Sequence, residues 1–122
     1  MGSIELLLDT DVLIRAWRGD AQLKARLDTC NAGTDTVARL EFLQGANKRQ
    51  AEAALEFIDR FEFIPFSPEV SFKADYLIRK FSHSTGLRLG DALIASAALV
   101  CELPLFSFNK RHFEFIEGII LV

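Results

Sequence analysis

Cysteine is scarce in this sequence, which argues against a disulfide framework or a zinc site. The two cysteines, Cys30 and Cys101, lie far apart, and neither belongs to a Cys-x-x-Cys motif. A chain of 122 residues buries roughly two-thirds of the surface that its unfolded form exposes, so it needs no crosslink to fold. We therefore expect both cysteines to be reduced and buried, in a protein of the cytoplasm.

A membrane-spanning run and a secretion signal are also missing. The most apolar run, residues 92–100, is far shorter than the roughly 20 residues that cross a membrane. The first residues include Glu5, Asp9 and Asp11, where a secretion signal has basic residues followed by an apolar core. These absences predict a soluble protein with no membrane partner.

The sequence lacks an excess of positive charge. Its formal net charge is -3 at pH 7, whereas proteins that grip nucleic acid with their whole surface are strongly basic. The balance does not exclude a nuclease, because the acids of a metal site carry negative charge until cations neutralise it.

What is present is the composition of one globular domain, with 50% hydrophobic and 25% charged residues. Apolar runs of strand length occur at residues 4–8, 61–66, 105–108 and 119–122, and residues 34–36 are a weaker candidate. Helical patterns fill the intervals, at residues 11–18, 20–27, 37–46, 49–60, 67–86 and 92–101. This alternation predicts a single α/β domain over residues 1–122, with a parallel sheet and helices on both faces.

Capping residues and apolar stripes describe several of these helices further. Asp20 is a candidate N-cap, Ser67 followed by Pro68 marks a helix start, and Gly86 marks a helix end. The stripes predict three buried faces: Val37, Leu40, Leu43 and Gln44; Ala51, Leu55 and Ile58; and Val70, Ala74, Leu77, Ile78 and Phe81.

Three acids stand where strands end or helices begin. Asp9 directly follows the first strand, Asp91 heads the most apolar helix, and Glu41 has apolar neighbours and is expected to lean toward the core. The carboxyl ends of parallel strands meet at one sheet edge, so we expect these side chains to converge there. Each acid also has a simpler interpretation, as an N-cap for Asp9 and Asp91 and as an exposed helix residue for Glu41.

Converging carboxylates repel one another unless a cation lies between them. Oxygen ligands favour Mg²⁺, with Mn²⁺ as an alternative, whereas zinc favours histidine and thiolate. Neither a zinc site nor a Ser-His-Asp nucleophile finds support, because His83 and His112 have no evident partner in the sequence. The acids therefore predict a magnesium site at this edge of the sheet.

Four blocks spread over nearly the whole chain carry a resemblance to a known family. They are residues 7–14 (LLDTDVLI), 37–46 (VARLEFLQGA), 89–95 (LGDALIA) and 106–113 (FSFNKRHF). In this order they resemble the PIN-domain ribonucleases, especially the VapC-like toxins of prokaryotic toxin–antitoxin pairs. Four ordered blocks are far more specific than any single acid.

The resemblance implies a PIN-like three-layer fold and Mg²⁺-dependent hydrolysis of RNA phosphodiester bonds. It places Asp9, Glu41 and Asp91 on the three recurrent metal-site acids of the family. The chain departs from the family in the last block, where Asn109 stands in place of a frequent fourth acid and His112 follows three residues later. Asn109 is expected to orient a metal-bound water through its amide.

Residues next to the predicted site are candidates for supporting roles. Thr10, Asp11, Thr36 and Ser107 are candidates for hydrogen bonds to the metal-site acids, with simple turn or cap hydrogen bonds as the alternative. Arg88, Lys110 and Arg111 are candidates for holding the RNA backbone. The resemblance also implies a cognate antitoxin and a homodimer, and 11 phenylalanines, more than one small core buries comfortably, favour self-association as well.

Two other functions remain open at this point. One is a PIN-like module that binds a partner without catalysis, which the missing fourth acid allows. The other is a receiver-like phosphoacceptor domain, which has a similar length and acids at the first strand. That fold needs an aspartate at the end of a central strand, whereas Asp59 lies in a helical pattern. A metal titration followed by an RNA cleavage assay separates all three.

Overall fold

The computed structural model describes residues 3–122, and its centre is a four-stranded parallel sheet in the order β3-β2-β1-β4. The strands are β1 (Leu6–Leu8), β2 (Ala32–Asp35), β3 (Glu62–Ile64) and β4 (Leu105–Phe106). Pairing is parallel throughout, with Leu7 opposite Gly33 of β2 on one side and opposite Leu105 of β4 on the other. All four strands therefore present their carboxyl ends at the same edge.

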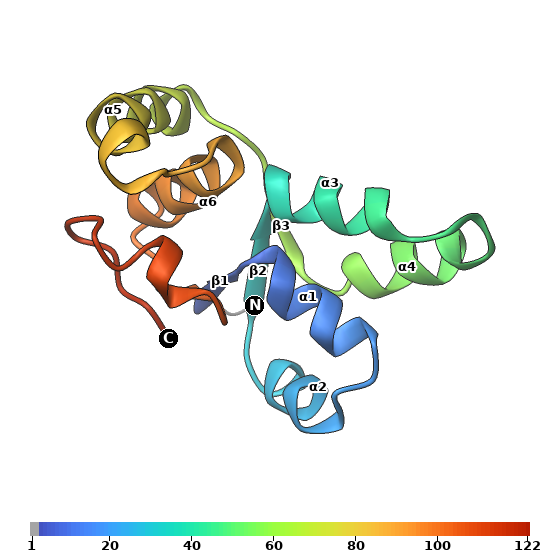
Figure 1. The fold of residues 1–122 in the computed structure, drawn as a ribbon. Helices are drawn as coiled ribbons and strands as arrows, with labels where there is room; N and C mark the ends of the chain where they lie inside the picture. The colour runs from blue at the N-terminus through green and yellow to red at the C-terminus, as the bar shows by residue number, and fades with distance from the viewer. Residues whose placement is uncertain (1–2) are drawn as a thin grey trace.

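Helices cover both faces of this sheet (Figure 1). One face carries α1 (Thr10–Trp17), α2 (Ala21–Asp28), α3 (Thr36–Gly45) and α4 (Ala51–Ile58), and the other carries α5 (Pro68–Thr85) and α6 (Leu89–Val100). Short 3₁₀ turns, η1 (Lys48–Gln50) and η2 (Lys110–His112), precede α4 and follow β4. The predicted α/β fold with a parallel sheet and helices on both faces is confirmed.

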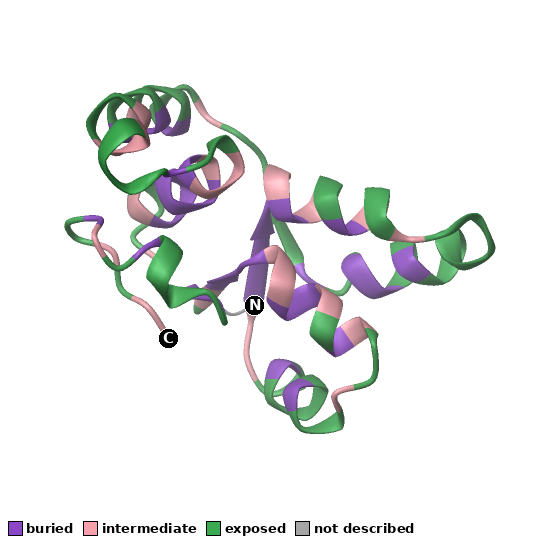
Figure 2. Cartoon of the chain, in the orientation of Figure 1, coloured by how far each residue is buried: buried purple, intermediate pink, exposed green. Residues whose placement is uncertain are grey.

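Neighbouring residues of a strand belong to two separate hydrophobic cores, because successive side chains point to opposite faces of the sheet. Leu8 and Phe106 pack with the α1–α4 layer, whereas Leu7 and Leu105 pack with α5 and α6. Figure 2 shows buried inner strands and buried inner sides of the helices, whereas the edge strand β3 is mostly exposed. Both faces of the central strands are thus packed against helices, which fixes the positions at which the loops leave their carboxyl ends.

The predicted helix ends are confirmed where a side chain caps the helix. Asp20 accepts a hydrogen bond from the backbone N–H of Leu23 (3.0 Å), and Ser67 accepts one from Val70 (3.3 Å). Gly86 ends α5 with a φ of 74°, a left-handed conformation that strains residues with a Cβ.

The predicted buried faces of α3 and α4 are wrong in most positions, although Ile58 of α4 is buried as predicted. Leu40 and Leu55 are 56% and 44% exposed, and the buried residues are Ala38 and Phe42 in α3 and Ala54, Phe57 and Ile58 in α4. The reason is an aromatic cluster between the helices: the rings of Trp17, Phe42 and Phe57 have centroids 5.4–5.8 Å apart. Burying these large rings outweighs burying a leucine elsewhere on the same helix.

The strand predicted at residues 119–122 is also wrong, because only Leu121 forms a bridge, to Leu105. The two cysteines are free, as expected, but Cys101 is exposed and Cys30 only half-buried. Cys101 lies at the C-cap of α6, just beyond the packed part of that helix. No helix within residues 3–122 is long and apolar enough to cross a membrane.

Candidate active site at the carboxyl edge of the sheet

Four carboxylates from four elements gather where the parallel strands end. Asp9 directly follows β1, Asp35 is the last residue of β2, Glu41 lies in α3, and Asp91 lies in the first turn of α6. Asp9 is 6% exposed and Asp35 is fully buried. Electrostatic repulsion links Asp9 to Glu41, Asp35 and Asp91, and links Glu41 to Asp35 and Asp91.

Asp9 is both a helix cap and a member of this cluster. Its Oδ1 accepts a hydrogen bond from the N–H of Thr10 (2.8 Å), and its Oδ2 accepts one from the Ser107 hydroxyl (2.7 Å). Burial raises the pKa of Asp9 to about 6, and repulsion from Asp11 and Glu41 adds to that rise, although both hydrogen bonds oppose it. The negative charge of Asp9 is therefore destabilised by burial and only partly stabilised by its two hydrogen bonds.

Glu41 lies outside the core, and a hydrogen bond from Thr10 orients its carboxylate toward the cluster. The prediction that it leans into the core is wrong, because the residue is exposed. The Thr10 hydroxyl donates to its Oε1 at 2.6 Å, and a methyl group placed on Gly90 would lie 3.7 Å from its Oε2. The carboxylate thus faces the first turn of α6, where Asp91 stands.

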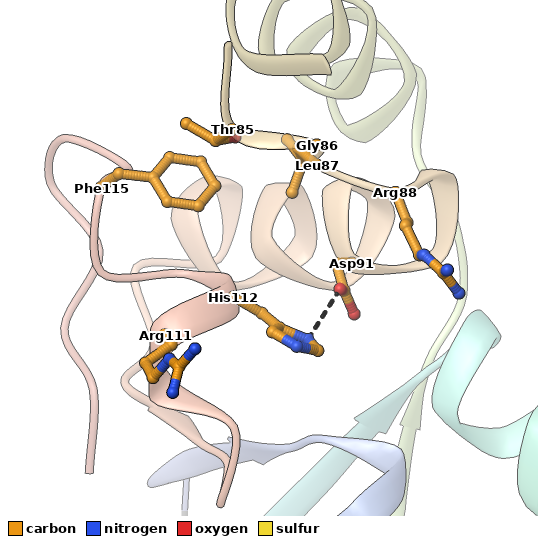
Figure 3. Close-up of a pocket in the computed structure, with 8 residues that line it drawn as sticks. All are labelled: Thr85, Gly86, Leu87, Arg88, Asp91, Arg111, His112 and Phe115. Atoms are coloured by element: carbon orange, nitrogen blue, oxygen red, sulfur yellow. Dashed lines mark ion pairs between the residues drawn. The ribbon is translucent and has the colours of Figure 1, made fainter. Parts of the chain in front are cut away.

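Asp91 pairs with a histidine that the sequence analysis left without a partner. Its Oδ2 lies 3.2 Å from Nδ1 of His112, and Figure 3 shows the two side chains pointing toward each other. Burial and then repulsion from Asp9 raise the pKa of Asp91, while His112 lowers it. The N-cap of α6 is Arg88, without a side-chain hydrogen bond, so the cap interpretation of Asp91 is wrong.

Asp35 is a member of the cluster that the sequence analysis missed. Its Oδ1 caps α3 through the N–H of Ala38 (2.8 Å), and its buried Oδ2 has no hydrogen-bond partner within residues 3–122. Burial raises its pKa to about 6, and repulsion from Asp9 and Glu41 contributes. The available signal was its position: like Asp9, it ends a strand directly before a helix.

The candidate supporting residues differ in how they contact the cluster. Thr10 and Ser107 donate to Glu41 and Asp9, as described above. Asp11 accepts a hydrogen bond from the N–H of Phe108 (3.1 Å) through Oδ2, and burial raises its pKa. Its buried Oδ1 has no hydrogen-bond partner in the part of the chain that the structure describes. Thr36 opens α3, and its hydroxyl forms no hydrogen bond to the acids in the described part of the chain.

The last block of the sequence borders the site. The N–H of Asn109 donates to the Ser107 hydroxyl (2.9 Å), and the residue itself is exposed. A hollow of about 170 Å³ beside Asp91 is lined by Arg88, Arg111 and His112, and Figure 3 shows both arginines flanking the acid. Lys110 lines the adjacent hollow. Cations thus form a rim next to the acids.

The side chains of the site offer oxygen atoms to a divalent cation. Within residues 3–122, no three His, Cys, Asp or Glu side chains are gathered closely enough to hold a metal ion as they stand. Two carboxylate oxygens, Asp11 Oδ1 and Asp35 Oδ2, are nevertheless buried without a hydrogen-bond donor from any described residue. All-oxygen donors with uncompensated charge fit Mg²⁺ or Mn²⁺ in kind. The identity of the ligands stays a prediction.

Comparison with known proteins gives consistent results. The family model described as PIN domain matches residues 6–117. The chain is 30% identical over 118 residues to Ribonuclease VapC10 of Mycobacterium tuberculosis, covering 92% of this chain and 88% of the relative. It is 28% identical over 114 residues to Ribonuclease VapC1 of Methanocaldococcus jannaschii, covering 90% and 79%.

Among solved structures, the chain is similar in fold to DNA-bound VapBC from Salmonella typhimurium, with a TM-score of 0.84, 24% identity and 98% of each chain covered. A toxin–antitoxin complex from Klebsiella pneumoniae gives a TM-score of 0.81 at 24% identity, covering 95% of this chain and 96% of that one.

Proposed function

This chain belongs to the PIN domain family, and from that premise we propose that it is a metal-dependent endoribonuclease that hydrolyses RNA phosphodiester bonds. The observation that carries the proposal is the cluster of Asp9, Asp35, Glu41 and Asp91 at one sheet edge, where buried negative charge lacks compensation. The relatives named ribonuclease support it through similarity over nearly the whole chain.

Asp9, Glu41 and Asp91 would hold the cation, with Asp35 and Asn109 at its border. When bound, Mg²⁺ or Mn²⁺ supplies charge neutralisation for the phosphoryl oxygens and activation of water. Ser107 and Thr10 orient the carboxylates of Asp9 and Glu41 through the hydrogen bonds already described.

The remaining residues of the site position the RNA. Arg88, Lys110 and Arg111 flank the acids and would bind phosphates on either side of the scissile bond. His112 holds Asp91 in place through the 3.2 Å contact. Because these cations form a local rim, the net charge of -3 is compatible with RNA binding.

We further propose that the protein is the toxin component of a toxin–antitoxin pair, forms a homodimer and acts in the cytoplasm. The structures it resembles are described as VapBC or toxin–antitoxin complexes, which supports an antitoxin partner. Exposed apolar side chains on α3, α5 and the start of α6 support self-association: Leu40 is 56%, Phe72 78% and Leu89 68% exposed.

The proposal is tested by RNA cleavage with Mg²⁺ or with EDTA, using wild type and Asp91→Asn. Asparagine keeps the size of aspartate but removes its charge, so we expect cleavage to fall by more than about a hundredfold, since even residues that only support metal ligands cost 10- to 100-fold. In EDTA, Asp91→Asn should be at least as stable as wild type, because one repelling charge is gone.

Asp75→Asn is the matched control, because Asp75 is an exposed acid on α5 that pairs with Arg79. It should cleave as wild type does. If Asp91→Asn also cleaves as fast as wild type, the metal site lies elsewhere. If Mg²⁺ stabilises the wild type but no RNA is cut, the chain is a PIN-like binding module, a function that Asn109 in place of an acid favours.

A further inference from the structure

An exposed aromatic ring stands directly beside the carboxylate cluster. Phe108, two residues after the end of β4, is 44% exposed. Its N–H donates to Asp11 (3.1 Å), and the residue before it, Ser107, donates to Asp9 (2.7 Å). These two hydrogen bonds hold the backbone at Phe108 next to Asp11 and Asp9, at the border of the site.

The ring is supported on one side and at its edge. The guanidinium of Arg15 lies 4.6 Å from the ring centroid of Phe108, and its Nε is held by Asp20 at 3.0 Å. The ring of Phe106 packs edge-to-face against Phe108 with centroids 5.4 Å apart. An aromatic surface that is already held in place loses little conformational entropy when a ligand stacks on it.

Phe108 borders two hollows, and Arg15 lines only one of them. The hollow lined by Arg15 has a volume of about 230 Å³, and Arg26 and Phe106 also line it. The other, of about 590 Å³, is lined by Phe108, Lys110, Arg111 and His112, among others. Its volume lies in the range of small-ligand sites, roughly 300 to 1,000 Å³, and it combines an aromatic ring with two cations next to the His112–Asp91 pair.

We propose that Phe108 is a stacking platform for one unpaired nucleobase of the RNA substrate, with Lys110 and Arg111 holding the adjacent phosphate. This inference rests on the proposed function. Only an unpaired base presents its flat face to a side chain, and base–aromatic stacking is the usual way in which proteins hold single-stranded RNA. The site therefore selects single-stranded RNA next to the scissile bond and does so without preference for one base.

A matched aromatic residue lies at the opposite edge of the sheet. Phe63 in β3 is 43% exposed, and Arg39 lies 5.2 Å from its ring centroid. Strand order puts β3 and β4 at the two ends of the sheet. Phe63 thus reproduces the exposure and the stacked arginine of Phe108 but does not line the hollow formed by Phe108, Lys110 and Arg111, so it serves as the control.

The first experiment uses Phe108→Trp as a reporter, because Trp17 is the only native tryptophan. A single-stranded oligoribonucleotide added in EDTA should quench the new fluorescence, while the same sequence annealed as a duplex should not. Phe63→Trp should respond to neither. Equal quenching by strand and duplex, or no quenching by either, overturns the platform.

The second experiment compares Phe108→Leu with Phe63→Leu, since leucine keeps apolar packing but removes the ring face. The Kd of Phe108→Leu for the single strand in EDTA should rise about tenfold, as expected for loss of one stacked base. With Mg²⁺, its KM should rise for single-stranded substrate more than for duplex. If Phe108→Leu and Phe63→Leu bind the single strand with equal Kd values, the proposal is overturned.

The two proposals fail separately. If wild type cleaves RNA with Mg²⁺ but Phe108→Leu binds and cleaves as wild type does, the platform is wrong and the ribonuclease stands. If wild type neither binds nor cleaves RNA, the proposed function itself is wrong. Thermal unfolding of each variant shows whether a loss comes from misfolding, and Phe108→Trp, which keeps the aromatic ring, should retain cleavage.

Discussion

At the scale of single residues, the site consists of acids that are held in unfavourable surroundings. Asp9 and Asp35 are buried carboxyls whose pKa values burial raises to about 6 from 3.8. A group that holds its proton more tightly in the folded chain makes folding less favourable once the solution pH removes that proton. The cluster therefore costs stability at neutral pH, which is typical of a functional site.

Asp35 gives a direct test of this cost. In the unfolded chain its carboxyl titrates near 3.8 and in the folded chain near pH 6, so the stability of the protein in EDTA should fall as pH rises between these values and stay low above them. A difference of about two pKa units corresponds to on the order of 3 kcal/mol. Asp35→Asn should remove this cost while its oxygen still caps α3 through Ala38.

Urea denaturation in EDTA measures the effect. Asp35→Asn should be more stable than wild type at about pH 7.5, by roughly 1–3 kcal/mol, and nearly equal to it at about pH 4. The exposed Asp75→Asn should show no gain that grows with pH. A loss of stability in Asp35→Asn of the same size at both pH values would mean that Asp35 acts only through its hydrogen bond.

At the scale of secondary-structure elements, the end of the long helix α5 determines where α6 begins, and α6 carries Asp91 into the site. The N-cap of α5 is Ser67 and its C-cap is Gly86, and after a short connection it is followed by α6. The left-handed φ of 74° at Gly86 redirects the chain there. Only glycine adopts this conformation freely, because a Cβ clashes with the following carbonyl oxygen.

Two glycines at helix ends allow the effect of a left-handed backbone on stability to be distinguished from the general effect of replacing glycine by alanine. Gly86→Ala should lower the free energy of unfolding by about 1–2 kcal/mol, because alanine is strained at positive φ. Gly45 ends α3 without a positive φ. Apart from the adjacent residues and the helix's own backbone, no heavy atom of the described chain lies within 4 Å of a Cβ placed at Gly45 or Gly86. Gly45→Ala should therefore raise stability by about 0.5–1 kcal/mol. Thermal or urea unfolding checks both, and equal signs would contradict the argument.

At the scale of the whole molecule, the two cores leave several large apolar side chains outside. Phe72 on α5 is 78% exposed and Ile120 near the C-terminus is 64% exposed. Single exposed apolar residues need no explanation, but those on α3, α5 and α6 are the ones on which the proposed homodimer depends.

Sedimentation tests the homodimer. Wild type should sediment as a dimer at micromolar concentration, and Phe72→Glu should shift it toward monomer without a lower melting temperature of the monomer, because the residue packs little within its own chain. Ile120→Glu introduces the same charge on a segment outside α3, α5 and α6 and should leave the dimer intact. A wild-type monomer at these concentrations contradicts self-association.

The sequence alone was sufficient for features that depend on neighbouring residues. Side-chain and backbone caps at Asp20, Ser67 and Gly86 act within a few residues of the chain, so their helix boundaries were predictable. The alternation of strands and helices predicted the parallel sheet, and the positions of Asp9 and Asp91 pointed to its carboxyl edge.

Tertiary structure decided what depends on residues far apart in the chain. Gly33 and Thr34 give β2 little apolar character, yet β2 is a fully buried central strand because β1 and β3 pair with it on either side. A Cβ placed on Gly33 would make tight contacts, 3.1 Å from the Ile4 side chain and 3.2 Å from the backbone oxygen of Glu62. That placement brings Asp35 into the cluster. The aromatic packing that exposes Leu40 and the hydrogen bond between Ser107 and Asp9, 98 residues apart, likewise arise only when the helices and strands meet.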